Sequence, residues 1–217
     1  MKYTAIFIFI LFLFPIFPQG VFAYEAATVE QPSPFKISEL KDVTTEQWFV
    51  GELNNFPHTF EFLLTEATTF KVQVMYREDS LATEQMSVLM VKEAERGVTE
   101  VMRRTADKVE WTAFTDPVSG LHFYENPIFD DRLEAGVYRV EVSNPNNFGR
   151  YVLKIGYEDD NGGYFNTLKD IKTLRNGLDL NTFGMIGNKY VYVPLFALVS
   201  VIFFSWFWFK RRWKLAL

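Results

Sequence analysis

The chain has 217 residues, 48% of them hydrophobic, and contains no cysteine. All 27 acidic residues lie between residues 24 and 189, whereas five of the 22 basic residues lie outside that segment, which therefore carries 17 basic residues and a net charge of −10. The apolar, acid-free ends exclude a soluble cytosolic enzyme. The acidic middle argues against nucleic-acid binding, which requires a basic surface. Without disulfides, this middle must be held together by a hydrophobic core.

Residues 1–23 have the pattern of a secretory signal peptide. Lys2 supplies the positive charge at the start, and residues 5–14 form an unbroken apolar run. That run is shorter than the roughly 20 residues needed to cross a bilayer. Compact residues before the cleavage position indicate cleavage after Ala23, so we expect an exported mature chain that begins at Tyr24.

The next region changes from a polar leader to a strand-like pattern. Residues 24–34 contain two prolines and predict a flexible leader. From residue 35 to residue 157, apolar and charged side chains alternate with a period of two, as in half-buried strands. The alternation is clearest over residues 59–64, 70–76, 138–142 and 150–155, and weaker over 47–53, 86–92, 100–104, 109–115 and 121–124. Turn-forming sequences separate these runs, which predicts an all-β domain, an antiparallel β-sandwich of about eight or nine strands.

Parts of this region resemble the bacterial pre-peptidase C-terminal domain, a jelly-roll β-sandwich attached to many secreted proteins. Residues 49–53 resemble its opening strand and turn, and residues 60–74 resemble its next two strands. Its closing hairpin, G-x-Y-x-V-x-V followed by G-x-Y-x-L-x-I, is matched by Gly136–Val142 and Gly149–Ile155. The resemblance covers about residues 46–157 and implies an antiparallel jelly roll.

Acidic turns are the candidate metal ligands. Members of that family sometimes bind calcium through acidic residues between strands, but residues 87–126 lack a dense aspartate cluster here. Two turns elsewhere offer the oxygen ligands that calcium prefers: Asp130 with Asp131, and Asp159 with Asp160. Neither turn matches an EF-hand loop, and such turns are also common as solvated surface. We expect no required cofactor, with calcium at these turns as the alternative.

Residues 158–189 are expected to form a juxtamembrane linker that contains a short amphipathic helix over about residues 164–176. Apolar residues recur there every three or four positions, with basic residues between them. The apolar stripe comprises Tyr164, Leu168, Ile171, Leu174 and Leu178, and the basic residues are Lys169, Lys172 and Arg175. The stripe could lie on the outer bilayer surface or pack against the sandwich, and the pattern leaves both arrangements open.

Residues 190–209 predict one transmembrane helix. They contain no charge, and at 1.5 Å per residue they match a hydrocarbon core of about 30 Å. The flanking basic residues are Lys189, Lys210, Arg211 and Arg212. Because basic tails stay in the cytoplasm, we expect residues 210–217 inside and the acidic domain outside, in a type I single-pass protein of the cell membrane. This order of segments also resembles GOLD-domain cargo receptors, although their long coiled coil before the membrane is missing here.

No pattern in the sequence indicates an active site. The two histidines, His58 and His122, lie far apart in the chain, and no G-x-S-x-G motif is present. Four aromatic residues of the expected strands could stack on sugar rings, although such residues more often form the core. They are Trp48, Trp111, Phe123 and Tyr124.

We therefore expect a non-enzymatic, membrane-anchored domain that binds a protein, glycan or envelope partner. The alternative is an accessory subunit that assembles with a larger membrane complex through its transmembrane helix. In that case Ser200 and Ser205 would be the polar groups available for contacts between helices.

Overall fold

The computed structural model describes residues 24–79, 85–159 and 162–213. The expected signal peptide and the last four residues of the expected basic tail lie outside the described residues. The chain falls into two compact units, one ending at Thr182 and the other including everything from Phe183 onward. Each unit is described by itself.

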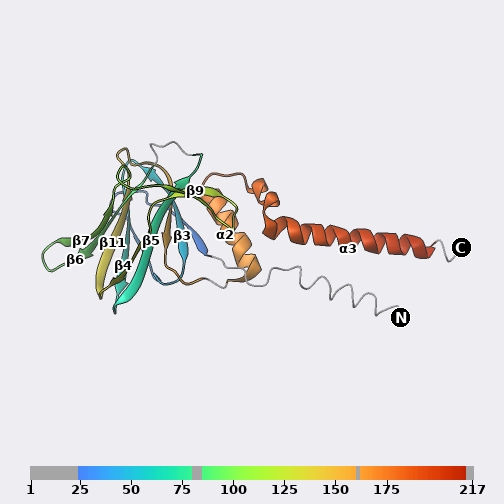
Figure 1. Ribbon diagram of the computed structural model, residues 1–217, viewed down its shortest axis with the longest axis horizontal. Helices are drawn as coiled ribbons and strands as arrows, with labels where there is room; N and C mark the ends of the chain where they lie inside the picture. The colour runs from blue at the N-terminus through green and yellow to red at the C-terminus, as the bar shows by residue number, and fades with distance from the viewer. Residues whose placement is uncertain (1–23, 80–84, 160–161, 214–217) are drawn as a thin grey trace. The chain divides into compact units, whose positions relative to one another are not determined.

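The first unit contains two β-sheets (Figure 1). The seven-stranded sheet runs in the order β1 (Glu25–Val29), β3 (Gln47–Asn54), β12 (Phe148–Ile155), β5 (Thr68–Arg77), β9 (His122–Glu125) and β8 (Thr112–Thr115), and β10 (Phe129–Leu133) also pairs with β5. The five-stranded sheet runs in the order β2 (Ile37–Glu39), β4 (His58–Leu64), β11 (Gly136–Ser143), β6 (Ser87–Glu93) and β7 (Val98–Arg104). Pairs β1–β3 and β2–β4 are parallel, and the other strand pairs are antiparallel.

This arrangement confirms a mostly β fold built from two sheets, with more strands than the sequence predicts. Each of the nine strands expected from the alternation is present. The described residues contain three further strands, β1, β2 and β10, each of five residues or fewer. These three segments show too little alternation to be recognised. Two of them pair in parallel, so the fold is not purely antiparallel.

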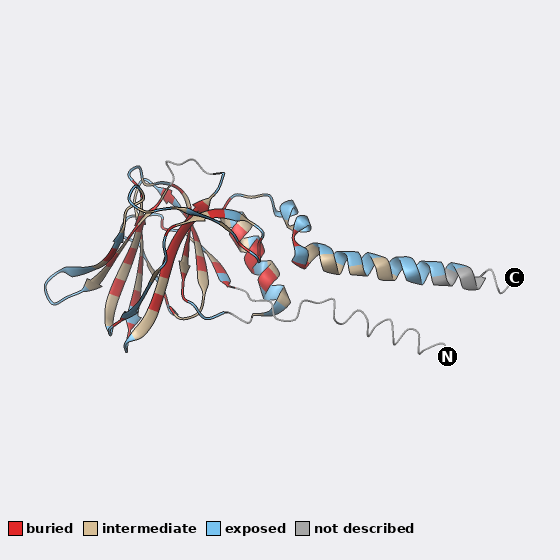
Figure 2. Ribbon diagram, viewed as in Figure 1, coloured by how far each residue is buried: buried red, intermediate tan, exposed pale blue. Residues whose placement is uncertain are grey.

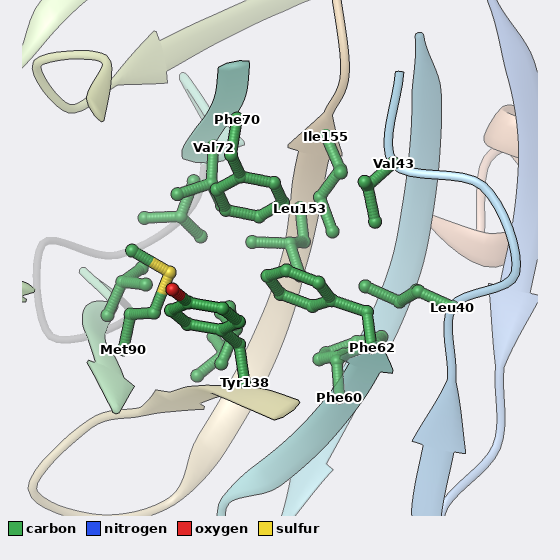
Figure 3. Packing of buried hydrophobic residues seen from close by; sticks show 14 of the residues in the cluster. Leu40, Val43, Phe60, Phe62, Phe70, Val72, Met90, Tyr138, Leu153 and Ile155 are labelled. Carbon is green, nitrogen blue, oxygen red and sulfur yellow. The ribbon is translucent and has the colours of Figure 1, made fainter. Parts of the chain in front are cut away.

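The hydrophobic core is made of residues from both sheets (Figures 2 and 3). Phe62 of β4 stacks on Phe70 of β5, with ring centroids 4.6 Å apart, and on Tyr138 of β11, at 5.4 Å. Leu153 of β12 is fully buried in the same cluster. Burying a side chain of this kind contributes about 1.5–3 kcal/mol, so an aromatic core of this size takes the place of disulfides.

The expected flexible leader is wrong for its first part, because residues 25–29 form β1 and pair in parallel with β3. Tyr24 is only 3% exposed, and its hydroxyl donates a hydrogen bond of 2.6 Å to Asp116. Both of its partners, Asp116 and the ring of Trp48, come from distant parts of the chain. No local pattern could have shown them, and the two prolines that suggested flexibility follow β1.

The amphipathic helix is α2 (Gly163–Gly177), and it packs on β1 and β3. Ile171 and Leu174 of the predicted stripe are fully buried there. Gly177 approaches Val50 so closely that a Cβ at this position would lie 2.7 Å from a Val50 methyl carbon. The arrangement with the stripe on the bilayer is therefore wrong, and packing against the sandwich is what the structure shows.

The second unit contains the 3₁₀ helix η3 (Thr182–Gly187) and the helix α3 (Lys189–Trp213). The side chain of Asn188 caps α3 by accepting a hydrogen bond of 2.9 Å from the backbone NH of Tyr190. A 19-residue stretch of α3, Lys189–Phe207, is long and apolar enough to cross a membrane. The helix continues past residue 209 into the expected tail, because nothing in Lys-Arg-Arg-Trp breaks a helix.

Candidate functional site

The candidate site begins with a turn that is held against the five-stranded sheet. The Gln31 side chain donates to the carbonyl of Thr59 at 2.8 Å and accepts from the Thr59 NH at 3.0 Å, as a neighbouring strand would. It also donates to the Ser38 hydroxyl at 2.9 Å. Across the turn, the Lys36 ammonium donates to the carbonyl of Glu30 at 2.9 Å. The turn between β1 and β2 is therefore fixed by hydrogen bonds on both sides.

Phe35 projects from this fixed turn and is 91% exposed. It borders an open groove of about 360 Å³ over the outer face of the five-stranded sheet. Ile37, Thr59, Glu141 and Leu89 form one row across four paired strands, so their side chains share this face. The complete lining is Pro34, Phe35, Ile37, Thr59, Leu89, Val91, Arg139 and Glu141.

The positive charge at the centre of the groove is paired with glutamates. Arg139 forms ion pairs of 2.7 Å with both Glu61 and Glu93. The hydrogen bond to Glu61 raises the pKa of the Arg139 guanidinium above its ordinary value. Because Arg139 is already paired, the groove offers apolar contact area between Leu89 and Val91 more than a free charge.

The predicted acidic turns are not brought together. Asp130 forms an ion pair of 2.9 Å with Lys71, and Asp131 accepts a hydrogen bond from the NH of Arg132. Asp159 is exposed after β12, and Asp160 lies outside the described residues. Within residues 24–79, 85–159 and 162–213, no group of three acidic or histidine side chains is close enough to hold a metal ion. Calcium binding at these turns stays a prediction.

The two histidines take part in separate structural contacts. His58 is buried, and its Nδ1 lies 2.8 Å from the hydroxyl of Tyr151. Burial lowers the pKa of the His58 imidazole. His122 is exposed, and its Nδ1 lies 2.9 Å from the Thr115 hydroxyl. The structure therefore places the two imidazoles on different sheets.

Of the four aromatic residues considered for sugar stacking, two are buried and two are partly buried. Trp48 and Phe123 are buried and lie edge to face, with centroids 6.1 Å apart. Trp111 and Tyr124 both pack on Tyr76, at 4.8 and 5.5 Å. No sequence pattern assigned a role to Phe35, and the signal that could have indicated it is an aromatic residue directly after Pro-Ser-Pro.

The residues that flank the apolar helix lie in or at the ends of α3. The Lys189 ammonium lies over the ring of Tyr190 at 5.1 Å, and that of Lys210 lies over Trp206 at 4.8 Å. Arg211 and Arg212 belong to the last turn of the helix. Between them α3 exposes large apolar side chains around its circumference, which Figure 2 shows as a mostly pale helix. A helix of this kind is suited to a lipid environment.

Comparison with known proteins gives a likeness to solved structures alone. No family model matches the chain, and no curated protein matches it. Among solved structures, the chain is similar to the pre-peptidase C-terminal domain of collagenase from Bacillus anthracis, with a TM-score of 0.36 and 12% sequence identity. The likeness covers 58% of this chain and 98% of that domain. The family named from the strand pattern therefore remains a resemblance.

Proposed function

We propose that this protein is a non-enzymatic, single-pass membrane protein whose β-sandwich lies outside the cytoplasm and binds a protein partner through the groove beside Phe35. The observation that carries the proposal is Phe35 itself. A phenylalanine exposed on a turn fixed by hydrogen bonds is a preorganised anchor, since little loop entropy is lost when it is covered.

The size of the expected contribution follows from apolar burial. Covering a phenylalanine side chain contributes about 1.5–3 kcal/mol, which corresponds to roughly a tenfold to hundredfold gain in affinity. Aromatic anchors of this kind, surrounded by smaller contacts, dominate many protein interfaces. Leu89 and Val91 supply such contacts in the groove.

The kind of partner follows from the charge of the groove. Arg139 is paired with two glutamates, so an apolar side chain of a partner fits this site better than an anion does. A small interface suffices when both proteins are held at the same membrane, because confinement raises their effective concentration.

The proposed fold and topology have separate support. Strands β3, β4, β5 and β6 belong to the two sheets in turn. Strand β11 then pairs between β4 and β6, and β12 pairs between β3 and β5, as in a jelly roll. The apolar surface of α3 supports a membrane anchor, and the basic residues at its C-terminal end support a cytoplasmic tail. In the alternative of an accessory subunit, Ser200 would make contacts between helices. Its hydroxyl already donates a hydrogen bond to the carbonyl of Phe196 within α3.

Site-specific photo-crosslinking of the full-length protein in its native membrane tests the proposal. Benzoylphenylalanine replaces Phe35, or as controls Phe148, which is exposed outside the groove, and Phe203 in α3. We expect a protein adduct from position 35 that is lost when Leu89→Glu places a charge in the groove. Adducts only from position 203 would favour the accessory subunit. No adduct from position 35, or one removed by glycosidases, would overturn the protein-binding groove.

A further inference from the structure

The outward side of α2 differs in charge from the rest of the exported domain. Phe165, Lys169 and Lys172 recur at helical spacing on the side away from β1 and β3, and all three are exposed, Phe165 to 81%. We call these three residues the outer face of α2. The helix contains a single acidic residue, Asp170, which is buried and accepts a hydrogen bond from the backbone NH of Ala26. The outer face is therefore basic with one aromatic residue.

Neither lysine of this face forms an ion pair with a described residue, whereas lysines elsewhere in the sandwich do, such as Lys71 with Asp130 and Lys154 with Glu46. The segment from residue 24 to residue 189 carries a net charge of −10. A basic face without acidic neighbours on its helix, in a domain of the opposite charge, is complementary to an anionic surface.

The length of the chain favours a membrane as that surface. Only residues 178–188 separate α2 from α3. A segment of this length reaches at most about 40 Å when fully extended, and part of it is wound into η3. If α3 crosses the bilayer, this segment tethers α2 within that distance of the point where α3 enters it. The local concentration of lipid headgroups around Lys169 and Lys172 is then high.

We propose that the outer face of α2 binds the surface of an anionic bilayer and holds the sandwich down on it. This inference rests on the membrane anchor of the proposed function. Lysines near an anionic surface each favour the bound state roughly fivefold, so the pair supplies roughly a thirtyfold preference. Phe165 enters the interface between headgroups and acyl chains, where aromatic side chains accumulate. One side of α2 thus packs on the sandwich while the other contacts lipid.

Because the chain contains no cysteine, a single introduced cysteine gives a unique attachment point for a fluorescent label. The labels are placed at Asn166→Cys beside the outer face, at Leu63→Cys on the outer face of the five-stranded sheet, and at Ser200→Cys in α3. Leu63 is 65% exposed, which makes it a matched solvent-facing control. The full-length protein is reconstituted into vesicles of phosphatidylcholine, alone or mixed with phosphatidylglycerol, that contain nitroxide-labelled lipids.

We expect lipid nitroxides to quench the label at position 166 in the phosphatidylglycerol vesicles, and to quench it several times less in phosphatidylcholine alone or at high salt. The label at position 63 stays unquenched in both. The double variant Lys169→Gln/Lys172→Gln should lose most of the quenching at position 166. The variant Lys41→Gln/Lys108→Gln, which removes two exposed lysines outside α2, should not.

Two failures are distinguishable. If the label at position 200 is quenched by deep nitroxides while the label at position 166 behaves like that at position 63, the anchor stands and the binding of α2 to lipid is overturned. If the label at position 200 is not quenched, the membrane anchor itself is wrong. Equal quenching at position 166 in the two double lysine variants would also overturn the role of Lys169 and Lys172.

Discussion

The ring of Tyr24 lies parallel to that of Trp48, with centroids 3.9 Å apart and an angle of 11° between the planes. Trp48 lies on β3, and Lys154 covers it with its ammonium 5.6 Å from the ring. Tyr24 also donates to Asp116, which accepts backbone hydrogen bonds from Val118 and Ser119. The first residue of the described chain is therefore an integral part of the sandwich.

Replacing Tyr24 should destabilise the domain. Tyr24→Ala removes both the stack and the hydrogen bond, and we expect a loss of about 3–5 kcal/mol in the free energy of unfolding. Tyr24→Phe keeps the stack, so the loss should be about 1.5–3 kcal/mol. Urea unfolding of the detergent-solubilised protein measures both. Glu25→Ala, at an exposed neighbour, is the control and should change stability by less than about 0.5 kcal/mol. An unchanged midpoint for Tyr24→Ala would show that β1 is not docked.

Stability should fall at alkaline pH because of two buried tyrosines. Burial raises the pKa of Tyr24 and of Tyr151 well above the ordinary value of 10.0, with Asp116 adding to the effect at Tyr24. Above pH 10 the unfolded chain releases these protons and the folded chain keeps them, so stability falls by about 1.4 kcal/mol per pH unit for each tyrosine. The double variant Tyr24→Phe/Tyr151→Phe should show a flatter decline in urea unfolding between pH 9 and 11, where ~ 2 protons fewer are released on unfolding. Parallel curves would contradict the burial of these hydroxyls.

A second pH effect is expected on the acid side. Burial lowers the pKa of His58 from 6.5, so the folded domain favours the neutral imidazole. The stability contributed by neutral His58 is complete above pH 6.5 and is lost as the pH falls through the lowered pKa. His58→Gln should remove this component while costing about 1–3 kcal/mol at pH 7 through the lost contact with Tyr151. Thermal unfolding of both proteins from pH 7 downward tests this, and identical pH profiles would contradict it.

Two glycines with the same φ angle allow the cost of backbone strain to be measured apart from the cost of steric crowding. Gly97 and Gly156 both have φ of +87°, but a Cβ at Gly97 meets nothing within 4 Å, whereas at Gly156 it would lie 2.1 Å from the carbonyl oxygen of Thr45. Gly97→Ala should therefore cost only the left-handed penalty of about 1–2 kcal/mol. Gly156→Ala should cost several kcal/mol, because the backbone around Thr45 must move. Unfolding midpoints measure the difference, and equal costs would place Thr45 further away.

Strands with a clear alternation were predictable, and the short strands β1, β2 and β10 were not. In β5 and β12, eight to ten residues alternate well enough to be recognised without a structure. In β10 the sequence Phe-Asp-Asp-Arg-Leu breaks the alternation, and the segment is a strand because it pairs with β5. Pairing partners come from the whole fold, so a short strand has no signature of its own.

The candidate groove could not be predicted from the sequence, because it also depends on contacts between distant parts of the chain. The exposure of Phe35 depends on Gln31, which holds the turn by bonding to Thr59, 28 residues further along the chain. The charge of Arg139 is paired only through Glu61 and Glu93 on the two neighbouring strands. Calcium binding at the acidic turns stays a prediction, because adjacency in sequence does not by itself supply the roughly six to eight oxygen ligands that calcium takes.

The burial of Tyr24 has a consequence for the order of maturation. Cleavage after Ala23, as the sequence predicts, would cut the bond directly before a residue that is 3% exposed in the folded domain. A peptidase needs the chain on both sides of that bond to be extended and accessible, so it must act before β1 docks on β3. If cleavage came late, the precursor could fold with the bond before Tyr24 inaccessible to the peptidase. Otherwise β1 would stay undocked, and one edge of β3 would be free to pair with other chains. If the chain is exported and cleaved there, then export, cleavage and closure of this sheet are coupled in time.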